Sequence, residues 1–279
     1  MKESTINRRQ LLAAALAGGV TPLSASCDSN GDMDSDLHNA LLWAVAWKQT
    51  AAEYRALCFQ AYNVAMMRVD QALAAGRDRP LAVVADMDDT VLHAGSYWGH
   101  LVANNREFFD DAIWDAWVTK NLVTAVPGAI AFFAHCEASS VEVFYVTSRD
   151  QGEQSFDIAL QNLRHLKFPF ADTDHLTVFR DSSDKSPARE KISRTHDIVL
   201  FIGDNLNDFK RDYYVKDVDQ RMALVDRDRD EFGSRFIVLP NPTDGHWVRA
   251  IFGESEPAPT RANLALLKAA ATRNAWDGR

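Results

Sequence analysis

The sequence has few cysteines. Cys27, Cys58 and Cys136 are the three cysteines among 279 residues, and none has the close Cys or His neighbours of a structural zinc site. Cys58 and Cys136 lie among apolar residues in helix-like patterns, so we expect two buried thiols, with a disulfide between them as the alternative. The chain also has no internal repeat and no low-complexity segment beyond its N-terminus, which argues against a fibrous or disordered protein.

The chain lacks an excess of basic residues. It has 30 Lys and Arg residues and 39 Asp and Glu residues, which give a formal net charge of −9. Residues 1–26 carry a net charge of +2, so the remaining chain has −11. This acidic character argues against nucleic acid polymers and anionic lipid surfaces as partners.

Beyond the N-terminus, no segment is long and apolar enough to span a bilayer. The N-terminus itself is typical of an export signal: Arg8 and Arg9 precede a short apolar stretch, and paired arginines suggest the twin-arginine route. We therefore expect a signal peptide at residues 1–26 and a flexible tether at residues 27–36. The residues around Cys27 resemble a lipoprotein cleavage box, and ordinary signal cleavage is the alternative. The expected location is the periplasm or the outer membrane, with a lipid anchor at Cys27 if the box is used.

Short apolar runs alternate with helical patterns from residue 81 onward. We expect strands near residues 81–86, 142–147, 176–179, 198–203, 222–226 and 235–239. We expect helices near residues 128–138, 152–166, 187–195 and 205–213. This alternation predicts an α/β fold, with a Rossmann-like parallel sheet flanked by helices.

The segment before this core, from Leu37 to about Ala75, has helical periodicity, and Gly76 would end it. It predicts a helical hairpin or one long helix that packs on the core. Residues 93–126 are rich in aromatic side chains and follow the first strand, so we expect a small helical cap insertion over the site. Residues 37–279 would form one domain with this cap, and an exposed aromatic cap could pair two chains into a homo-oligomer.

Acidic residues directly follow the first predicted core strand. Asp86 and Asp88 come after the apolar run 81–85, and in an open α/β sheet ligands bind just beyond the carboxyl ends of the strands. Two carboxylates facing the same crevice repel each other unless a cation lies between them. This arrangement suits a metal-assisted carboxylate nucleophile with a second carboxyl group as acid and base. The alternative is that the acids cap a following helix.

Three later segments place polar side chains at comparable positions. Thr147 ends the second core strand, and Lys185 stands just before a predicted helix. Asp204 and Asp208 follow the strand near 198–203. The order along the chain is therefore a pair of acids, a threonine, a lysine and a second pair of acids.

This order resembles the haloacid dehalogenase (HAD) superfamily of phosphatases. More narrowly it resembles the class C acid phosphatases, bacterial surface lipoproteins that act as 5′-nucleotidases. Residues 199–209 fit that family's second signature throughout. The first signature fits more loosely, because Met87, Asp89 and Ala94 replace its usual residues. The resemblance extends from about Leu41 to the C-terminus.

The resemblance implies a Mg²⁺-dependent acid phosphatase that hydrolyses small phosphomonoesters through an aspartyl-phosphate. Asp86 would be the nucleophile, and Asp88 would protonate the leaving group and then deprotonate the hydrolytic water. Thr147 and Lys185 would hold the transferring oxygens. The metal ligands would come from four acids, with Asp88 contributing its main-chain carbonyl and Asp208 orienting a bound water: Asp86, Asp88, Asp204 and Asp208.

The same resemblance implies that a nucleobase is held between two aromatic faces. Trp114 is expected at one wall of this clamp. Asp244 stands where the family usually has the tyrosine of the other wall, so either Tyr97, His246 or Trp247 replaces that ring or the preference for nucleotides is weakened. We therefore expect activity on several phosphomonoesters, with nucleoside 5′-monophosphates among them. Two alternatives stay open: a phosphotransferase that uses alcohol acceptors, and a non-catalytic binding or storage protein of the same fold.

Overall fold

The centre of the protein is a five-stranded sheet in which all neighbouring strands are parallel, in the order β5-β4-β1-β6-β7. The structure is a computed structural model that describes residues 39–76 and 78–278, so the predicted signal peptide, the tether and Cys27 lie outside the described residues. The strands are β1 (Leu81–Ala85), β4 (Glu142–Ser148), β5 (Leu176–Phe179), β6 (Asp197–Gly203) and β7 (Phe236–Val238). The predicted α/β fold with a parallel sheet is confirmed.

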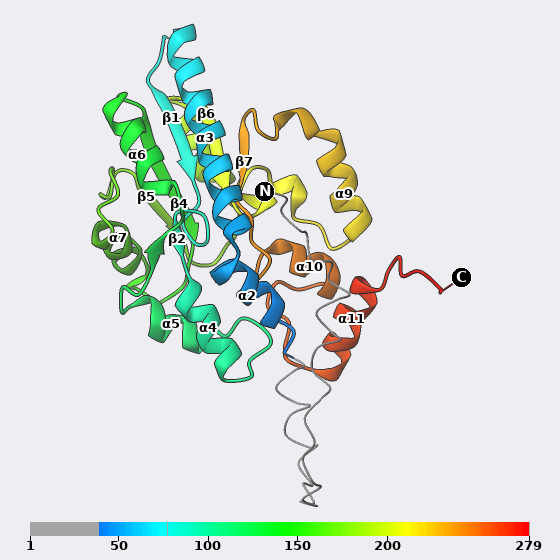
Figure 1. The fold of residues 1–279 in the computed structure, drawn as a ribbon. Helices are drawn as coiled ribbons and strands as arrows, with labels where there is room; N and C mark the ends of the chain where they lie inside the picture. The colour runs from blue at the N-terminus through cyan, green and yellow to red at the C-terminus, as the bar shows by residue number, and fades with distance from the viewer. Residues whose placement is uncertain (1–38, 77, 279) are drawn as a thin grey trace, which may run out of the picture. The chain divides into compact units, whose positions relative to one another are not determined.

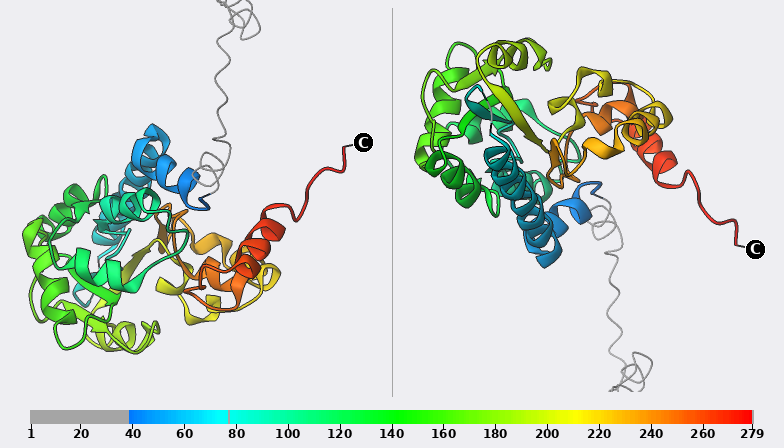
Figure 2. Two further views of the ribbon diagram at one scale, coloured as in Figure 1. Left: turned by 90° about the horizontal axis from the view of Figure 1, so that it is seen from below. Right: turned by 90° about the horizontal axis from the view of Figure 1, so that it is seen from above.

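Helices cover both faces of this sheet (Figure 1, Figure 2). The long helix α3 contacts β6 and β7, α6 contacts β4, and α3 and α6 also contact each other, so they share one face. Helix α8 contacts β6 from the second core described below. The α-helices of the core are α3 (Ala52–Ala75), α6 (Ala129–Ala138), α7 (Ser155–His165) and α8 (Ser186–Ser193).

Strand β1 is buried on both faces. Successive side chains of a strand point to opposite faces, so Leu81, Val83 and Ala85 belong to the larger core, while Ala82 and Val84 belong to the smaller one. The chain first adds β4 and β5 on one side of β1 and then β6 and β7 on the other. The carboxyl end of β1 therefore lies where the strand order reverses, which is the usual ligand site of such sheets.

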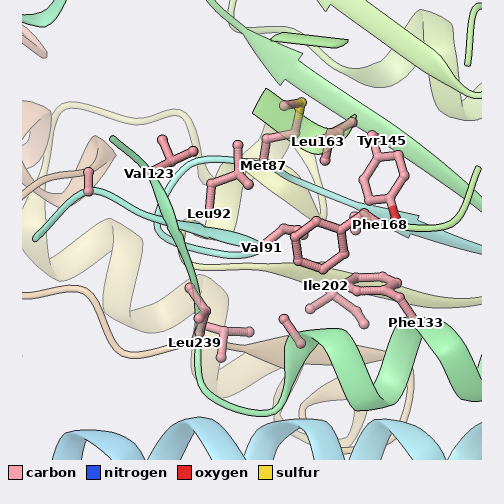
Figure 3. Packing of buried hydrophobic residues seen from close by; sticks show 14 of the residues in the cluster. Met87, Val91, Leu92, Val123, Phe133, Tyr145, Leu163, Phe168, Ile202 and Leu239 are labelled. Carbon is pink, nitrogen blue, oxygen red and sulfur yellow. The ribbon is translucent and has the colours of Figure 1, made fainter. Parts of the chain in front are cut away.

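The same alternation of side chains places the first pair of acids. Met87, between Asp86 and Asp88, is fully buried in the larger core together with Leu163 and Tyr145 (Figure 3). Because Met87 points into the core, the two neighbouring carboxylates are free to face the crevice above the sheet.

The N-terminal helical segment consists of two helices, α2 (Leu42–Thr50) and α3, separated at Ala51, where the backbone is extended. Gly76 ends α3 with a positive φ, as the sequence predicts. Cys58 on α3 and Cys136 on α6 are both buried and unpaired, so the expectation of two thiols is confirmed.

Two predicted elements of the core were wrong. The apolar run at 222–226 is not a strand but part of α9 (Val218–Arg227), whose first turn is capped by Asp217 accepting a hydrogen bond from the Gln220 amide. Met222 is 58% exposed, because the run lies along a surface helix and not in the sheet. Short apolar runs of this kind do not distinguish a strand from a helix.

The predicted helix at 205–213 is replaced by two short 3₁₀ turns, η1 (Leu206–Asp208) and η2 (Arg211–Tyr213). The carboxylate of Asp208 accepts a hydrogen bond from the Asn205 amide at 3.0 Å, which closes a tight turn. This contact begins a helical turn, but the backbone is extended at Lys210, so the turn ends there and no regular helix forms.

The segment between β1 and α6 folds into two helices, α4 (Gly95–Ala103) and α5 (Asp111–Val118). Its two ends pair as a small antiparallel sheet, β2 (Leu92–His93) with β3 (Thr124–Ala125), so the segment leaves the core and returns to it at one place. The C-terminal part contains η3 (Arg229–Glu231), α10 (His246–Phe252) and α11 (Arg261–Ala271). Within the described residues, none of the helices has the length and apolar character needed to cross a membrane.

Candidate active site

A pocket of about 450 Å³ lies at the carboxyl end of the parallel sheet. It collects side chains from segments that are far apart in the sequence. Seven residues singled out from the sequence line it: Asp86, Asp88, Trp114, Thr147, Lys185, Asp204 and Asp208. Thr147, at the end of β4, is buried beside them with 1% of its surface exposed.

Three carboxylates form the floor of this pocket. Asp86, Asp204 and Asp208 each offer an oxygen, and these atoms all lie within 4.8 Å of one another. Burial, together with the neighbouring carboxylates, raises the pKa of Asp86 to about 7 although Lys185 opposes the shift. Burial and the charges of Asp86 and Asp208 raise the pKa of Asp204 well above its usual range. Such a group of oxygen donors fits a hard divalent cation, which would relieve the repulsion.

Lys185 lies against two of these acids. Its ammonium group contacts the Asp86 carboxylate and donates to Asp208 Oδ1 at 2.7 Å. Burial alone would favour the neutral amine, but the carboxylates of Asp208 and Asp86 raise the pKa of Lys185 above its usual value. Helix α8 begins immediately after Lys185 and has Pro187 in its first turn, so the residue is held at a rigid helix start.

The side chain of Asp88 lines the same pocket and is held by an arginine. Arg149 donates to both of its oxygens, from Nε at 2.7 Å and from Nη2 at 2.5 Å. Arg149 is itself nearly fully buried, and its Nη1 donates to Asn162 Oδ1 at 2.8 Å. The fork of the guanidinium therefore holds Asp88 in one orientation. This pairing was not predicted from the sequence, because Arg149 lies 61 residues from Asp88 along the chain.

Both oxygens of Asp204 are occupied by hydrogen bonds. Thr90 Oγ1 donates to Oδ1 at 2.9 Å, and Asn241 Nδ2 donates to Oδ2 at 2.7 Å. Sequence reasoning assigned no role to these two donors. Thr90 closes the Asp-x-Asp-x-Thr segment, so its position carried a signal, whereas Asn241 stands 37 residues after Asp204 and meets it only in the fold.

Trp114 lies at the pocket wall contributed by α5. Its ring packs edge-on against Tyr97, with 5.1 Å between the ring centroids, and the Arg149 guanidinium lies 5.8 Å from the Trp114 ring centre. Trp114 is 7% exposed, so only part of its surface is open to a ligand. Trp117, one turn further along α5, is equally buried and belongs to the core.

Tyr97 was wrongly predicted to contact a substrate. Its side chain is fully buried, and it is not among the residues that line the pocket. The Tyr97 hydroxyl accepts a hydrogen bond from the Asp110 amide at 2.9 Å and donates to the Asp110 carbonyl at 3.2 Å. The Tyr97 ring therefore packs against Trp114 within the core and does not face the pocket. Of the other two proposed replacements, His246 lines the pocket and Trp247 does not.

Asp244 lines the same pocket. Burial raises the pKa of Asp244 to about 6, and the charges of Asp89 and Asp88 add to this effect while the Gly245 amide and Lys48 oppose it. An acid that is partly neutral near pH 6 thus stands where the family resemblance implies an aromatic ring.

A parallel α/β sheet with an acidic pair at the end of its central strand, a threonine, a lysine and a second acidic pair defines a HAD-type phosphatase. Residues 29–247 match the family described as HAD superfamily, subfamily IIIB (acid phosphatase), and the chain belongs to this family. It is an acid phosphatase, and its substrates are small-molecule phosphoesters.

The solved structures agree with this assignment. The class C acid phosphatase from Bacillus anthracis is 32% identical, with a TM-score of 0.76, covering 85% of this chain and 96% of that chain. A second structure of class C acid phosphatase from Bacillus anthracis, with tungstate bound, is also 32% identical, with a TM-score of 0.77 and coverage of 84% and 96%.

Proposed function

We propose that this acid phosphatase depends on Mg²⁺ and hydrolyses phosphomonoesters, including nucleoside 5′-monophosphates, through an aspartyl-phosphate on Asp86. The observation that carries the proposal is that Asp86 contacts the ammonium group of Lys185 and clusters with the carboxylates of Asp204 and Asp208. These three acids and the main-chain carbonyl of Asp88 would supply the metal site. Bound Mg²⁺ would neutralise charge on the carboxylates and on the phosphoryl oxygens.

Asp86 would attack phosphorus in line with the departing alkoxide, forming the bond from its carboxylate oxygen to phosphorus as the ester bond breaks. A carboxylate is a weak nucleophile toward an anionic phosphate, so neutralisation of charge must contribute much of the rate. Lys185 already contacts Asp86, and Thr147 is buried at the adjacent strand end. Both would hold the transferring oxygens. A similar class C acid phosphatase from Bacillus anthracis has been solved with tungstate bound, and tungstate is an oxyanion like phosphate.

Asp88 would act as the acid in the first half-reaction and as the base in the second. With Arg149 donating two hydrogen bonds to it, Asp88 has the geometry of an ionised carboxylate. This is the form that accepts a proton from the water that hydrolyses the aspartyl-phosphate. For the first half-reaction Asp88 would carry a proton and give it to the leaving oxygen.

The leaving group would occupy the part of the pocket beside Trp114, below α4 and α5, which we propose act as a cap. Asp244 and His246 also line this pocket, and Asp244 takes the place of the second ring of the clamp that the resemblance implies. We therefore propose a broad substrate range, in which the ring of Trp114 favours a nucleobase and the polar lining by Asp244 and His246 also accepts aliphatic phosphates.

We further propose that the chain is exported, with residues 1–26 as signal peptide and Cys27 as the site of lipid attachment. Mass spectrometry of the protein isolated from its native envelope tests this. We expect Cys27 to be the N-terminal residue and to carry a lipid. An N-terminal Cys27 without a lipid would mean that the protein is exported but not anchored.

The central test measures phosphate release from a nucleoside monophosphate and from glycerol phosphate, with Mg²⁺ or with EDTA, for the parent and for Asp86→Asn. The expected results are loss of activity with EDTA, recovery with Mg²⁺, and no activity in the variant. Asp78→Asn, an exposed acid, is the matched control. Acid quenching during turnover should trap a phosphorylated parent protein and no phosphorylated Asp86→Asn.

Activity that survives chelation would refute the metal requirement, and an absent phosphoenzyme would refute the covalent intermediate. Adding glycerol distinguishes the remaining alternatives. Glycerol phosphate as the main product would identify a phosphotransferase, and no turnover of any phosphomonoester would identify a binding or storage protein.

A further inference from the structure

A buried lysine from the N-terminal helix stands beside the active site. Lys48 lies in the last turn of α2, and only 2% of its surface is exposed. Its ammonium group pairs with Asp89 Oδ2 at 2.6 Å and donates to Asn241 Oδ1 at 3.1 Å and to Thr243 Oγ1 at 3.0 Å. These contacts use all three N–H donors of the side chain.

The contact with Asn241 decides which way this amide points. Lys48 can only donate, so the oxygen of the amide must face it and the NH₂ group must face the opposite side. The Thr243 amide and hydroxyl donate to the same oxygen at 3.1 and 2.7 Å, which strengthens this choice. The Asn241 Nδ2 group donates to Asp204 Oδ2 at 2.7 Å and, over the longer distance of 3.4 Å, to Asp89 Oδ2.

We propose that Lys48 is a positioning residue for the divalent metal site. It fixes the Asn241 amide, and the amide in turn holds the carboxylate of Asp204 in the orientation that faces Asp86 and Asp208. The inference rests on the proposed Mg²⁺ site. It also means that docking of helix α2, which lies more than 100 residues before Asp204 in the sequence, contributes to metal affinity.

The sign of the effect distinguishes this role from simple electrostatics. Removing a positive charge near a cation site would by itself strengthen the binding of Mg²⁺, because the repulsion between Lys48 and the metal disappears. Loss of a group that orients a metal ligand weakens binding, typically by 10- to 100-fold. We therefore expect Lys48→Met to bind Mg²⁺ about 10-fold more weakly, against the direction of the charge effect.

The Lys48→Met variant alone leaves the buried carboxylate of Asp89 unpaired, which can prevent folding. The experiment therefore uses an Asp89→Asn background, so that removal of Lys48 leaves no buried carboxylate without its cation; in the background itself the Lys48 ammonium group still donates to Asn241 and Thr243. Asp89 has a φ of +55°, and asparagine tolerates this conformation better than most residues. The Mg²⁺ dissociation constant is measured by isothermal titration calorimetry on chelator-treated full-length protein, so the readout does not depend on turnover.

Four proteins make a double-mutant cycle in the Asp89→Asn background: the background itself, the background with Lys48→Met, the background with Asn241→Ala, and the background with both changes. If Lys48 acts through Asn241, its removal weakens Mg²⁺ binding about 10-fold when Asn241 is present and has little effect when Asn241 is absent. Lys210→Met, which breaks the Lys210–Asp228 pair at 3.0 Å, controls for the loss of a lysine ion pair and should bind Mg²⁺ like the parent.

Unchanged or tighter binding after removal of Lys48 overturns the inference, because the charge effect would then dominate. Equal losses with and without Asn241 also overturn it, because Lys48 would not act through the amide. A parent protein that binds no Mg²⁺ would refute the proposed function and this inference with it. If the parent binds Mg²⁺ normally, a failure of the Lys48 prediction refutes only this inference and leaves the proposed function standing.

Discussion

Replacing Asp244 by asparagine should stabilise the protein at neutral pH and not in acid. Burial in the pocket wall raises the pKa of Asp244 to about 6 from an ordinary value of 3.8. In the folded protein the neutral carboxyl group is therefore favoured, whereas the unfolded chain ionises at its ordinary pKa. An asparagine cannot ionise, and its carbonyl can still accept the hydrogen bond from the Gly245 amide that the carboxylate accepts.

The sign of the pH dependence follows from proton binding. Below pH 3.8 the carboxyl group is protonated in both states, and Asp244 costs nothing. Between 3.8 and about 6 the folded state holds a proton that the unfolded state has lost, so stability falls as the pH rises. Above about 6 the full cost is present. One pKa unit corresponds to about 1.36 kcal/mol, so the upper bound is about 3 kcal/mol.

Asp244 is partly exposed to the water of the pocket, which reduces this bound. We therefore expect Asp244→Asn to raise the free energy of unfolding by about 1–3 kcal/mol at about pH 7.5 and by almost nothing at about pH 4. Urea unfolding of the parent and the variant at both pH values, with EDTA present to remove metal linkage, measures this difference. Asp78→Asn, an exposed acid, should show no such gain at either pH.

A gain of the same size at both pH values would show that asparagine merely packs better and that ionisation is not the cause. No gain at about pH 7.5 would show that Asp244 is ionised at little cost in the folded protein. Either result would refute the argument that an uncompensated acid stands in this wall of the pocket.

Three further results are expected. Lys185→Met should lower kcat by about 1,000-fold or more, because it removes a cation at the transferring phosphoryl group. Lys191→Met, on the exposed side of the same helix, should leave kcat unchanged, and steady-state kinetics measures both variants. Trp114→Ala should lower kcat/KM for a nucleoside monophosphate by about 5- to 100-fold, which corresponds to the loss of one stacked base. The kcat/KM for glycerol phosphate should be nearly unchanged, and equal losses for both substrates would mean that the Trp114 ring serves only packing. Cys58 and Cys136 are buried thiols, so a thiol-alkylating reagent should label them only after unfolding, and labelling of the native protein seen by mass spectrometry would contradict their burial.

Much of the fold was predictable because local patterns carry it. Each buried parallel strand appears in the sequence as a short apolar run, and the run at 81–85 is buried at every position. Polar residues directly after such runs must lie at one edge of the sheet, which is why Asp86, Thr147 and Asp204 could be brought together without a structure. The error at 222–226 has the opposite cause: an apolar run of that length fits a surface helix as well as a strand.

By itself, the sequence determined the parallel α/β architecture, the acids at the strand ends and the family, because these depend on the order of residues along the chain. Tertiary structure alone decided which partner each polar group has. Arg149 lies 61 residues from Asp88, and Lys48 lies 193 residues from Asn241, yet both pairs are in direct contact. The Tyr97 side chain is fully buried, and its hydroxyl is hydrogen-bonded to the backbone of Asp110. A buried donor needs a partner wherever the fold supplies one, and spacing along the chain does not reveal which partner that is.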